Sequence, residues 1–320
     1  MFEHLERRGL QIASRPVPAV SFACGKAIIV GEHAVVHGAQ AIAMPVKHLG
    51  MYLNLVPDFN SEKVRCRLFL GGCDVSDKIG DLVLTAFKIL QIEPFALTIK
   101  GDSNIPVGAG LGSSATLCVA ILRAILASCR RHCNPQSIAK QANLMEERFH
   151  GNPSGLDTSV VSHGSCIKFV KGDQPSGLKL SAKVSKWRFA LVDSKLRAAT
   201  RTMIVKAAPF FLGNRGKQRV ELFNDLALQA EYGLTQGSSE NLANAMNEAG
   251  IYLKEAGVVP PALQDIINFC RKLDIPAAKT TGAGGGGTIL CLLTQDKADN
   301  QIRTLTSVYS KDRVTVTEIG

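Results

Sequence analysis

Long apolar segments and aromatic side chains are scarce in this sequence of 320 residues. Phe, Trp and Tyr together make up 6% of it, with a single Trp. No apolar run approaches the ~18 residues that a membrane-spanning helix needs, and the best candidate, residues 115–127, is interrupted by Arg123. The first 20 residues include Glu3 and Glu6 and have no apolar core. We therefore expect neither a secretory signal nor a membrane partner.

Closely paired cysteines are also absent. The nine cysteines form no C-x-x-C motif, and most lie in apolar stretches such as the one around Cys118. Cys129, His132 and Cys133 lie near one another, but no second ligand pair with the spacing of a zinc site follows. This usage indicates buried thiols in a reducing compartment, and the cytoplasm is the default expectation.

Acidic residues are outnumbered by basic ones. Lys and Arg total 37 against 27 Asp and Glu, which gives a formal net charge of +10. Such a surface attracts anions. Nucleic-acid binding would also predict dense basic runs with interleaved aromatic residues, whereas the basic residues here are scattered. We expect small anionic ligands and no nucleic-acid partner.

Short strands and helices follow one another in mixed order. Apolar alternation and β-branched residues predict strands at 20–31, 41–56, 63–70, 95–100, 187–193, 288–293 and 313–318. Helical spacing and capping residues predict helices at 76–92, 114–131, 134–150, near 154, and near 218–234, 238–256 and 261–273. A polar stretch at 171–185 indicates a boundary. These features favour an α+β protein with two domains, 1–180 and 181–320.

The loop from Ile105 to Ala115 reads IPVGAGLGSSA and leads into an apolar helix. Glycines let the backbone approach a ligand closely, and a helix N-terminus offers unpaired N–H groups to an anion. The segment therefore predicts a phosphate cradle, with the hydroxyls of Ser113 and Ser114 available to Mg²⁺ on a nucleotide. It is neither a Walker A sequence nor a dinucleotide fingerprint. A flexible surface loop is the alternative.

Three further segments carry residues suited to chemistry. In the stretch Thr280–Gly287, five of the last six residues are glycine. Ordering so many glycines costs conformational entropy, and a loop packed against a ligand accounts for that cost better than a flexible tether does. Asp157 lies near a helix start and could accept a proton from a hydroxyl, with helix capping as the alternative. Lys26 lies in an apolar strand and needs an anionic partner. Nearby, His33 and His37, taken singly, are more often hydrogen-bonded structural residues than catalysts.

Taken together, these segments resemble the motifs of the GHMP kinase superfamily, which includes galactokinase, homoserine kinase, mevalonate kinase and phosphomevalonate kinase. The matching motifs occur in family order at 25–38, 106–115 and 281–287. Within the superfamily, the strings GEHAVVHG, HGNPSGLD and TGAGGGG are most similar to the mevalonate kinase family, at 31–38, 150–157 and 281–287.

The resemblance implies a fold and a reaction. The N-terminal domain would resemble ribosomal protein S5 domain 2, the C-terminal domain would be ferredoxin-like, and the active site would lie in the cleft between them. The implied reaction is ATP-dependent phosphorylation of the C5 hydroxyl of (R)-mevalonate to 5-phosphomevalonate, in isoprenoid and sterol biosynthesis.

The resemblance also implies roles for individual residues. Asp157 is the expected catalytic base, and Lys26 would stabilise charge beside it. Ser114 and Glu146, rather than Glu147, would bind Mg²⁺. Contacts with ATP are expected from Pro106, Gly108, Ala109, Gly110, Leu111, Gly112, Ser113, Ser114, Gly284 and Gly285. Contacts with mevalonate are expected from Lys26, Glu32, His33, Asp157, Arg197 and Thr200.

The sequence departs from the family where the mevalonate carboxylate is expected to bind. Animal-type members carry Arg two residues before the threonine, and here that position is Ala198, with Arg197 beside it. Arg197, another cation or backbone N–H groups could therefore hold the carboxylate.

Other readings stay open beside this one. They are phosphomevalonate kinase, a sugar kinase, mevalonate diphosphate decarboxylase, or an RNA-binding protein with salt-sensitive affinity. The resemblance also allows inhibition by prenyl diphosphates, a monomer or homodimer, and a cytoplasmic or peroxisome-like location.

Overall fold

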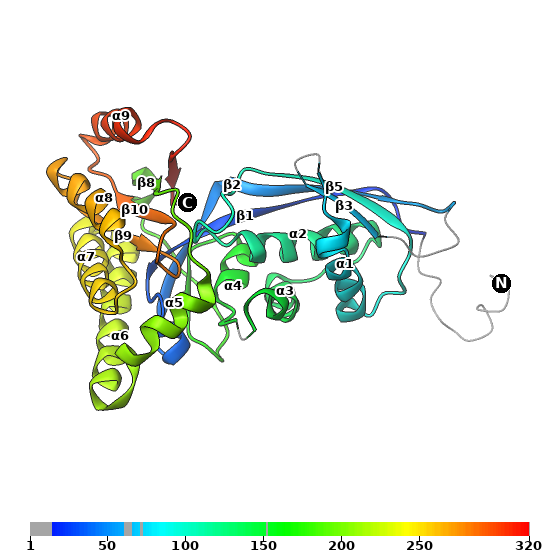
Figure 1. Ribbon diagram of the computed structural model, residues 1–320, viewed down its shortest axis with the longest axis horizontal. Coiled ribbons are helices and arrows are strands. Elements are labelled where there is room, and N and C mark those ends of the chain that lie inside the picture. The colour runs from blue at the N-terminus through cyan, green and yellow to red at the C-terminus, as the bar shows by residue number, and fades with distance from the viewer. Residues whose placement is uncertain (1–14, 61–65, 71–72, 152, 320) are drawn as a thin grey trace.

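The computed structural model describes residues 15–60, 66–70, 73–151 and 153–319. Its strands form two sheets, one of seven strands and one of four. The expected boundary between residues 180 and 181 falls between β7 (Ser176–Gly177), in the first sheet, and β8 (Arg188–Asp193), in the second. The α+β class and the two-domain organisation are confirmed (Figure 1). The segment that bears on a secretory signal and residues 63–65 of an expected strand lie outside the described residues.

The N-terminal domain is built on the long antiparallel pair β1 (Ala19–Val30) and β2 (Ala41–Pro57). The strand order is β4–β3–β5–β2–β6–β7, with β1 also paired to β2. The remaining strands are β3 (Cys66–Leu70), β4 (Cys73–Asp74), β5 (Leu97–Ser103) and β6 (Ile167–Phe169). Residues 51–57 alternate between buried and exposed, so one face of this sheet packs on the core and the other meets solvent.

Four helices lie along the buried face of this sheet (Figure 1). They are α1 (Ser76–Leu90), α2 (Ser113–Ser128), α3 (Pro135–His150) and α4 (Leu156–His163). Helix α2 is apolar on nearly all sides and is buried between β1 and the other helices. Helix α3 begins as its sequence predicts, because the Asn134 side chain accepts a hydrogen bond from the Ser137 N–H at 2.8 Å and Pro135 occupies the first position.

The C-terminal domain has the strand order β11–β8–β10–β9, with all pairs antiparallel. The added strands are β9 (Ala277–Thr281), β10 (Thr288–Leu292) and β11 (Val314–Glu318). Its helices are α5 (Thr200–Ala207), α6 (Gly213–Gln236), α7 (Ser239–Glu255), α8 (Pro261–Lys272) and α9 (Ala298–Tyr309). This β-α-β-β-α-β arrangement is ferredoxin-like. In this domain β9, α5 and α9 were not predicted from the sequence, and α6 begins five residues before its predicted start; in the first sheet β4, β6 and β7 were not predicted either.

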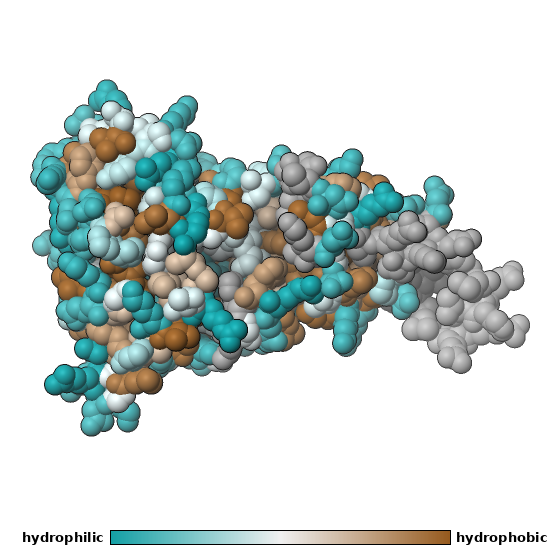
Figure 2. Space-filling view, viewed as in Figure 1, coloured by the Kyte–Doolittle hydropathy of each residue, from teal (hydrophilic) through white to brown (hydrophobic). Residues whose placement is uncertain are grey.

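An apolar core joins the two domains. Ala27 and Val46 of the first sheet belong to the same buried cluster as Phe223 of α6. At its edge, Lys168 of β6 is ion-paired with Glu231 of α6 at 3.0 Å. Figure 2 shows hydrophilic side chains over much of the visible face, with smaller apolar areas between them. In the part of the chain that the structure describes, no helix is both long and apolar enough to cross a membrane.

Candidate functional site

The backbone conformation of the loop before α2 depends on its glycines. Gly108, Gly110 and Gly112 have φ angles of 70°, 80° and 76°, which residues with a Cβ rarely adopt. The backbone N–H of Lys26 donates to the carbonyl of Leu111 at 3.1 Å, so the loop is tied to β1. Helix α2 has no acidic residue in its first turn. Its N-terminal N–H groups and helix dipole therefore favour an anion.

The second glycine-rich loop, 282–287, joins β9 to β10 and packs against the first. A Cβ on Gly282 would lie 2.8 Å from Cα of Gly110, and a Cβ on Gly287 would lie 2.8 Å from the carbonyl oxygen of Ala109. Only glycine permits this backbone-to-backbone approach. The two loops that the sequence singles out, from different domains, are therefore in direct contact.

A cavity of about 120 Å³ lies between the two domains beside these loops. Its polar lining comes from Lys26, Glu32, His33, Glu146, Ser154, Asp157 and Thr200, and its apolar lining includes Ile28, Val35 and Ile204. Of the residues expected to bind ATP, Gly110 lines this cavity. Gly284 and Gly285 lie elsewhere, with Gly285 N–H bonded to the Val258 carbonyl at 2.7 Å.

Lys26 and Asp157 meet at the wall of this cavity. Nζ of Lys26 lies 3.0 Å from Oδ1 of Asp157, and the side chains are 2% and 34% exposed. Asp157 is in the first turn of α4, after Gly155 with φ 87°. The lysine thus has the anionic partner that its buried place in β1 requires. The carboxylate stays accessible from the cavity.

A second carboxylate lies close by. Glu146 is buried on α3, and its Oε1 accepts a hydrogen bond from the Ser114 hydroxyl at 2.7 Å. Burial, with the nearby charge of Asp157, raises the pKa of Glu146 to about 7. Glu147 faces outward and is exposed. Hydroxyl and carboxylate oxygens from α2, α3 and α4 therefore converge at the cavity. No group of three or more His, Cys, Asp or Glu side chains is placed to hold a metal among the described residues.

Glu32 and His33 connect the cavity to the C-terminal domain. The Glu32 carboxylate is ion-paired with Lys279 of β9, and both side chains are buried. His33, at φ 58°, donates through Nε2 to the Ala283 carbonyl at 2.8 Å. Burial lowers the pKa of His33. Sequence reasoning missed Lys279, although a lysine among the small residues just before the second glycine-rich loop was a readable signal.

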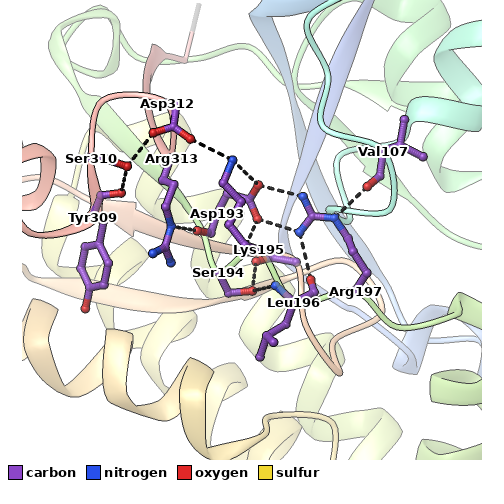
Figure 3. Close-up of polar contacts among 11 residues, drawn as sticks. Val107, Asp193, Ser194, Lys195, Leu196, Arg197, Tyr309, Ser310, Asp312 and Arg313 are labelled. Atoms are coloured by element: carbon purple, nitrogen blue, oxygen red, sulfur yellow. Dashed lines mark hydrogen bonds and ion pairs between the residues drawn. The ribbon is translucent and has the colours of Figure 1, made fainter.

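Thr200 and Arg197 occupy different places. Thr200 starts α5 and lines the cavity. Arg197 is absent from the lining: its guanidinium contacts both oxygens of Asp193 at 2.7 and 2.8 Å and the Val107 carbonyl at 2.8 Å (Figure 3). The structure therefore brings Lys26, Glu32, His33, Glu146, Asp157 and Thr200 together and leaves Arg197 outside.

Family models and known proteins of similar sequence match this chain. The model of the GHMP kinases N terminal domain matches residues 81–165, and that of the GHMP kinases C terminal domain matches residues 230–311. The mevalonate kinase of Archaeoglobus fulgidus is 29% identical over 288 residues, which cover 87% of this chain and 93% of the relative. The mevalonate kinase of Aeropyrum pernix is 25% identical over 303 residues, covering 90% and 92%.

Solved structures show the same fold. A crystal structure of L. major mevalonate kinase in complex with R-mevalonate has a TM-score of 0.79 and 19% identity, covering 96% of this chain and 98% of that one. Lactococcus lactis galactokinase complexed with galactose also has a TM-score of 0.79, with 14% identity and coverage of 100% and 98%. Because two proteins with different acceptors fit equally well, the fold alone does not select the acceptor.

Proposed function

Because this chain belongs to the GHMP kinase superfamily, we propose that it transfers the γ-phosphoryl group of ATP to the C5 hydroxyl of mevalonate, giving 5-phosphomevalonate. The observation that carries the proposal is the Lys26–Asp157 pair, which lies in a cavity between two domains and beside a glycine-rich helix start. The choice of acceptor is supported by the mevalonate kinase relatives, which align over most of both chains.

Asp157 is the base in this proposal. Its carboxylate accepts the C5 hydroxyl proton as the oxygen attacks the γ-phosphorus. Lys26, 3.0 Å away, orients the carboxylate and neutralises charge on the transferring group. Phosphoryl transfer depends mainly on positioning and charge neutralisation, so we expect the lysine to matter about as much as the base. The loop 106–112 and the first turn of α2 hold the phosphates of ATP.

Mg²⁺ fits the oxygen groups beside this pair. Glu146 is buried near the carboxylate of Asp157, and its pKa is raised to about 7. A bound cation would reduce the repulsion between these two carboxylates. Ser114 and Glu146 supply the hard oxygen ligands that Mg²⁺ prefers. Bound there, Mg²⁺ would neutralise negative charge on the phosphates of ATP.

The acceptor occupies the cavity in this scheme. Ile28, Val35 and Ile204 suit its methyl and methylene groups, and Glu32, His33 and Thr200 suit its hydroxyl and carboxylate. Among the described residues that line the cavity, Lys26 carries the positive charge, and it is already paired with Asp157. We therefore favour backbone N–H groups at the start of α5, together with the Thr200 hydroxyl, for binding the carboxylate.

We also propose a mode of inhibition, a location, an oligomeric state and a domain boundary. Prenyl diphosphates would compete with ATP, because their diphosphate suits the same N–H cradle. The protein would act in the cytoplasm or a peroxisome-like organelle, as a monomer or homodimer. The boundary between residues 180 and 181 is supported by the change of sheet between β7 and β8.

The test is ADP release from MgATP, with mevalonate, phosphomevalonate, galactose and homoserine offered separately. We expect turnover with mevalonate alone, and its loss in Asp157→Asn. Asp299→Asn is the matched control, because Asp299 is an exposed carboxylate paired with Arg188 on the surface. Turnover with another acceptor would overturn the substrate, and full activity of Asp157→Asn would overturn the assigned base.

A further inference from the structure

The turn between β8 and α5, residues 194–197, lies between the two glycine-rich loops. Ser194 donates through both its N–H and its hydroxyl to the Gly287 carbonyl, at 2.9 and 2.7 Å. In return, the Gly287 N–H donates to the Leu196 carbonyl at 2.8 Å. On the other side of the turn, Nε of Arg197 donates to the Val107 carbonyl at 2.8 Å (Figure 3). One short turn therefore holds both loops.

The guanidinium of Arg197 is directed to acceptors within the protein. It forms a two-point contact with Asp193, and Nη1 also donates to the Leu196 carbonyl at 2.9 Å. Such bidentate pairs fix the orientation of both groups. The hydrogen bonds that Arg197 donates to the Asp193 carboxylate raise the pKa of Arg197. Its stem covers the loop as well, since a Cβ on Gly108 would lie 3.2 Å from Cδ of Arg197.

Asp193 is itself held in place by the C-terminal domain. Its Oδ1 accepts a hydrogen bond from the Lys195 N–H at 2.8 Å, and its backbone carbonyl accepts one from Nε of Arg313 at 2.7 Å. Lys195 in turn is ion-paired with Asp312 at 3.0 Å. Figure 3 shows these contacts as a continuous chain from Asp312 through Asp193 and Arg197 to Val107.

The tip of the first loop, residues 106–108, depends on this chain. Val107 is 81% exposed, so little side-chain burial holds the tip. Within the described part of the chain, the hydrogen bond from Arg197 is what links the tip to the C-terminal domain. Losing it would release residues 106–108 from the C-terminal domain, while Ala109 and Gly110 stay packed against the second glycine-rich loop.

We propose that Arg197, oriented by Asp193, is a positioning residue that sets the phosphate-binding loop against the C-terminal domain. It does not bind the acceptor carboxylate. This inference rests on the proposed function, in which loop 106–112 holds the phosphates of ATP. Arg197 acts through the Val107 carbonyl, so its loss weakens nucleotide binding and leaves the acceptor site intact.

The experiment compares Arg197→Met with wild type. Met retains much of the side-chain stem and removes the guanidinium. We expect the Kd of the non-hydrolysable analogue MgAMPPNP, measured by calorimetry without acceptor, to rise about tenfold, as the loss of a charge-assisted hydrogen bond predicts. The KM for ATP should rise in parallel. The KM for mevalonate should stay within about twofold of the wild-type value, a smaller change than the loss of one direct hydrogen bond would cause.

Arg188→Met is the matched control. Arg188 begins the same strand as Asp193 and forms an Arg–Asp pair with Asp299 at 2.7 Å, far from either loop along β8. Its replacement removes a single, more exposed Arg–Asp contact without touching the loops. We expect the wild-type Kd for MgAMPPNP and the wild-type KM for both substrates.

A raised KM for mevalonate with an unchanged Kd for MgAMPPNP would overturn the inference in favour of direct carboxylate binding. An Arg197→Met protein unchanged in both would overturn it too. If Arg197→Met does not fold, Asp193→Asn applies the same test, with an expected rise in Kd of about threefold because one weaker contact remains. Failure of the proposed function is distinguishable, because the nucleotide measurement needs no acceptor.

Discussion

The Lys279 ammonium is ion-paired with the Glu32 carboxylate, and both side chains are buried where the two domains meet. Lys279 lies on β9, and its Nζ also donates to the Thr280 carbonyl at 2.8 Å. Glu32 follows β1 and lines the cavity. The pair therefore fixes one wall of the proposed acceptor site relative to the C-terminal domain. Burial raises the pKa of Glu32 and lowers that of Lys279, so each partner needs the other to remain charged.

Replacing Lys279 alone should destabilise the protein strongly. Lys279→Met leaves the Glu32 carboxylate buried without its cation, which costs about 3–5 kcal/mol. The double variant Lys279→Met/Glu32→Gln should recover part of this loss, because no buried charge remains. Urea unfolding of the three proteins measures both effects. The loss should shrink at acid pH, where Glu32 takes up a proton, and a loss that is independent of pH and of Glu32 would contradict the assignment.

Replacing Lys26 should affect the chemical step more than folding. Lys26→Met removes the cation beside Asp157, and loss of one such group lowers kcat by about 10²–10³-fold. Rapid-quench measurement of a single turnover reports this step directly. Lys168→Met is the control, since it removes an interdomain ion pair of equal length, 3.0 Å to Glu231, away from the cavity. A similar kcat for the two variants would exclude a role for Lys26 in transfer.

Much of the site was predictable because each of its residues lies within or beside a short sequence motif. Lys26, Ser114, Glu146 and Asp157 each lie beside glycine-rich or capping signals, and the structure brings all four together. Strand β9 was missed because all five of its residues are buried, so it has no alternation of apolar and polar positions. Helix α5 is short and has only two buried side chains, which gives no apolar stripe to detect.

Arg197 and Lys279 show what sequence cannot supply. Their partners are Val107 and Glu32, which lie in the other domain. The small neighbours of Lys279 in Ala-Ala-Lys-Thr-Thr are a signal of a buried position, but nothing in the residue spacing indicates which carboxylate it meets. Arg197 lies near the expected position in the chain, yet the turn directs its guanidinium to Asp193 and away from the cavity. Side-chain direction of this kind is decided by tertiary packing.

The contact between the two glycine-rich loops should not tolerate a methyl group. In Gly282→Ala, the Cβ would lie 2.8 Å from Cα of Gly110 at φ 83°. Gly164→Ala is the control, because Gly164 has φ 62° with nothing within 4 Å of the added atom. The control should lose about 1 kcal/mol from its backbone angle. Gly282→Ala should lose more and also raise the KM for ATP, and equal effects of the two variants on unfolding and KM would contradict close packing of the loops.

Glu146 should make the metal-free protein less stable as pH rises. Its pKa in the folded protein is raised from 4.5 to about 7, by burial first and by the charge of Asp157 second. The folded state then holds this proton more tightly than the unfolded state does. The free energy of unfolding therefore falls between those two pH values and stays lower above them.

Glu146→Gln should remove that cost while keeping an acceptor for the Ser114 hydroxyl. Without metal, we expect the variant to be more stable than wild type by about 1–3 kcal/mol near pH 8, and the difference to vanish below about pH 4.5, where the wild-type carboxyl is protonated in both states. Mg²⁺ should raise the Tm of wild type and leave that of the variant nearly unchanged, and the variant should lose Mg²⁺-dependent turnover. Thermal unfolding across pH, with and without Mg²⁺, measures each part. A variant less stable than wild type at pH 8 would show that Glu146 is satisfied by its protein neighbours, and the case for a cation beside Ser114 would fail.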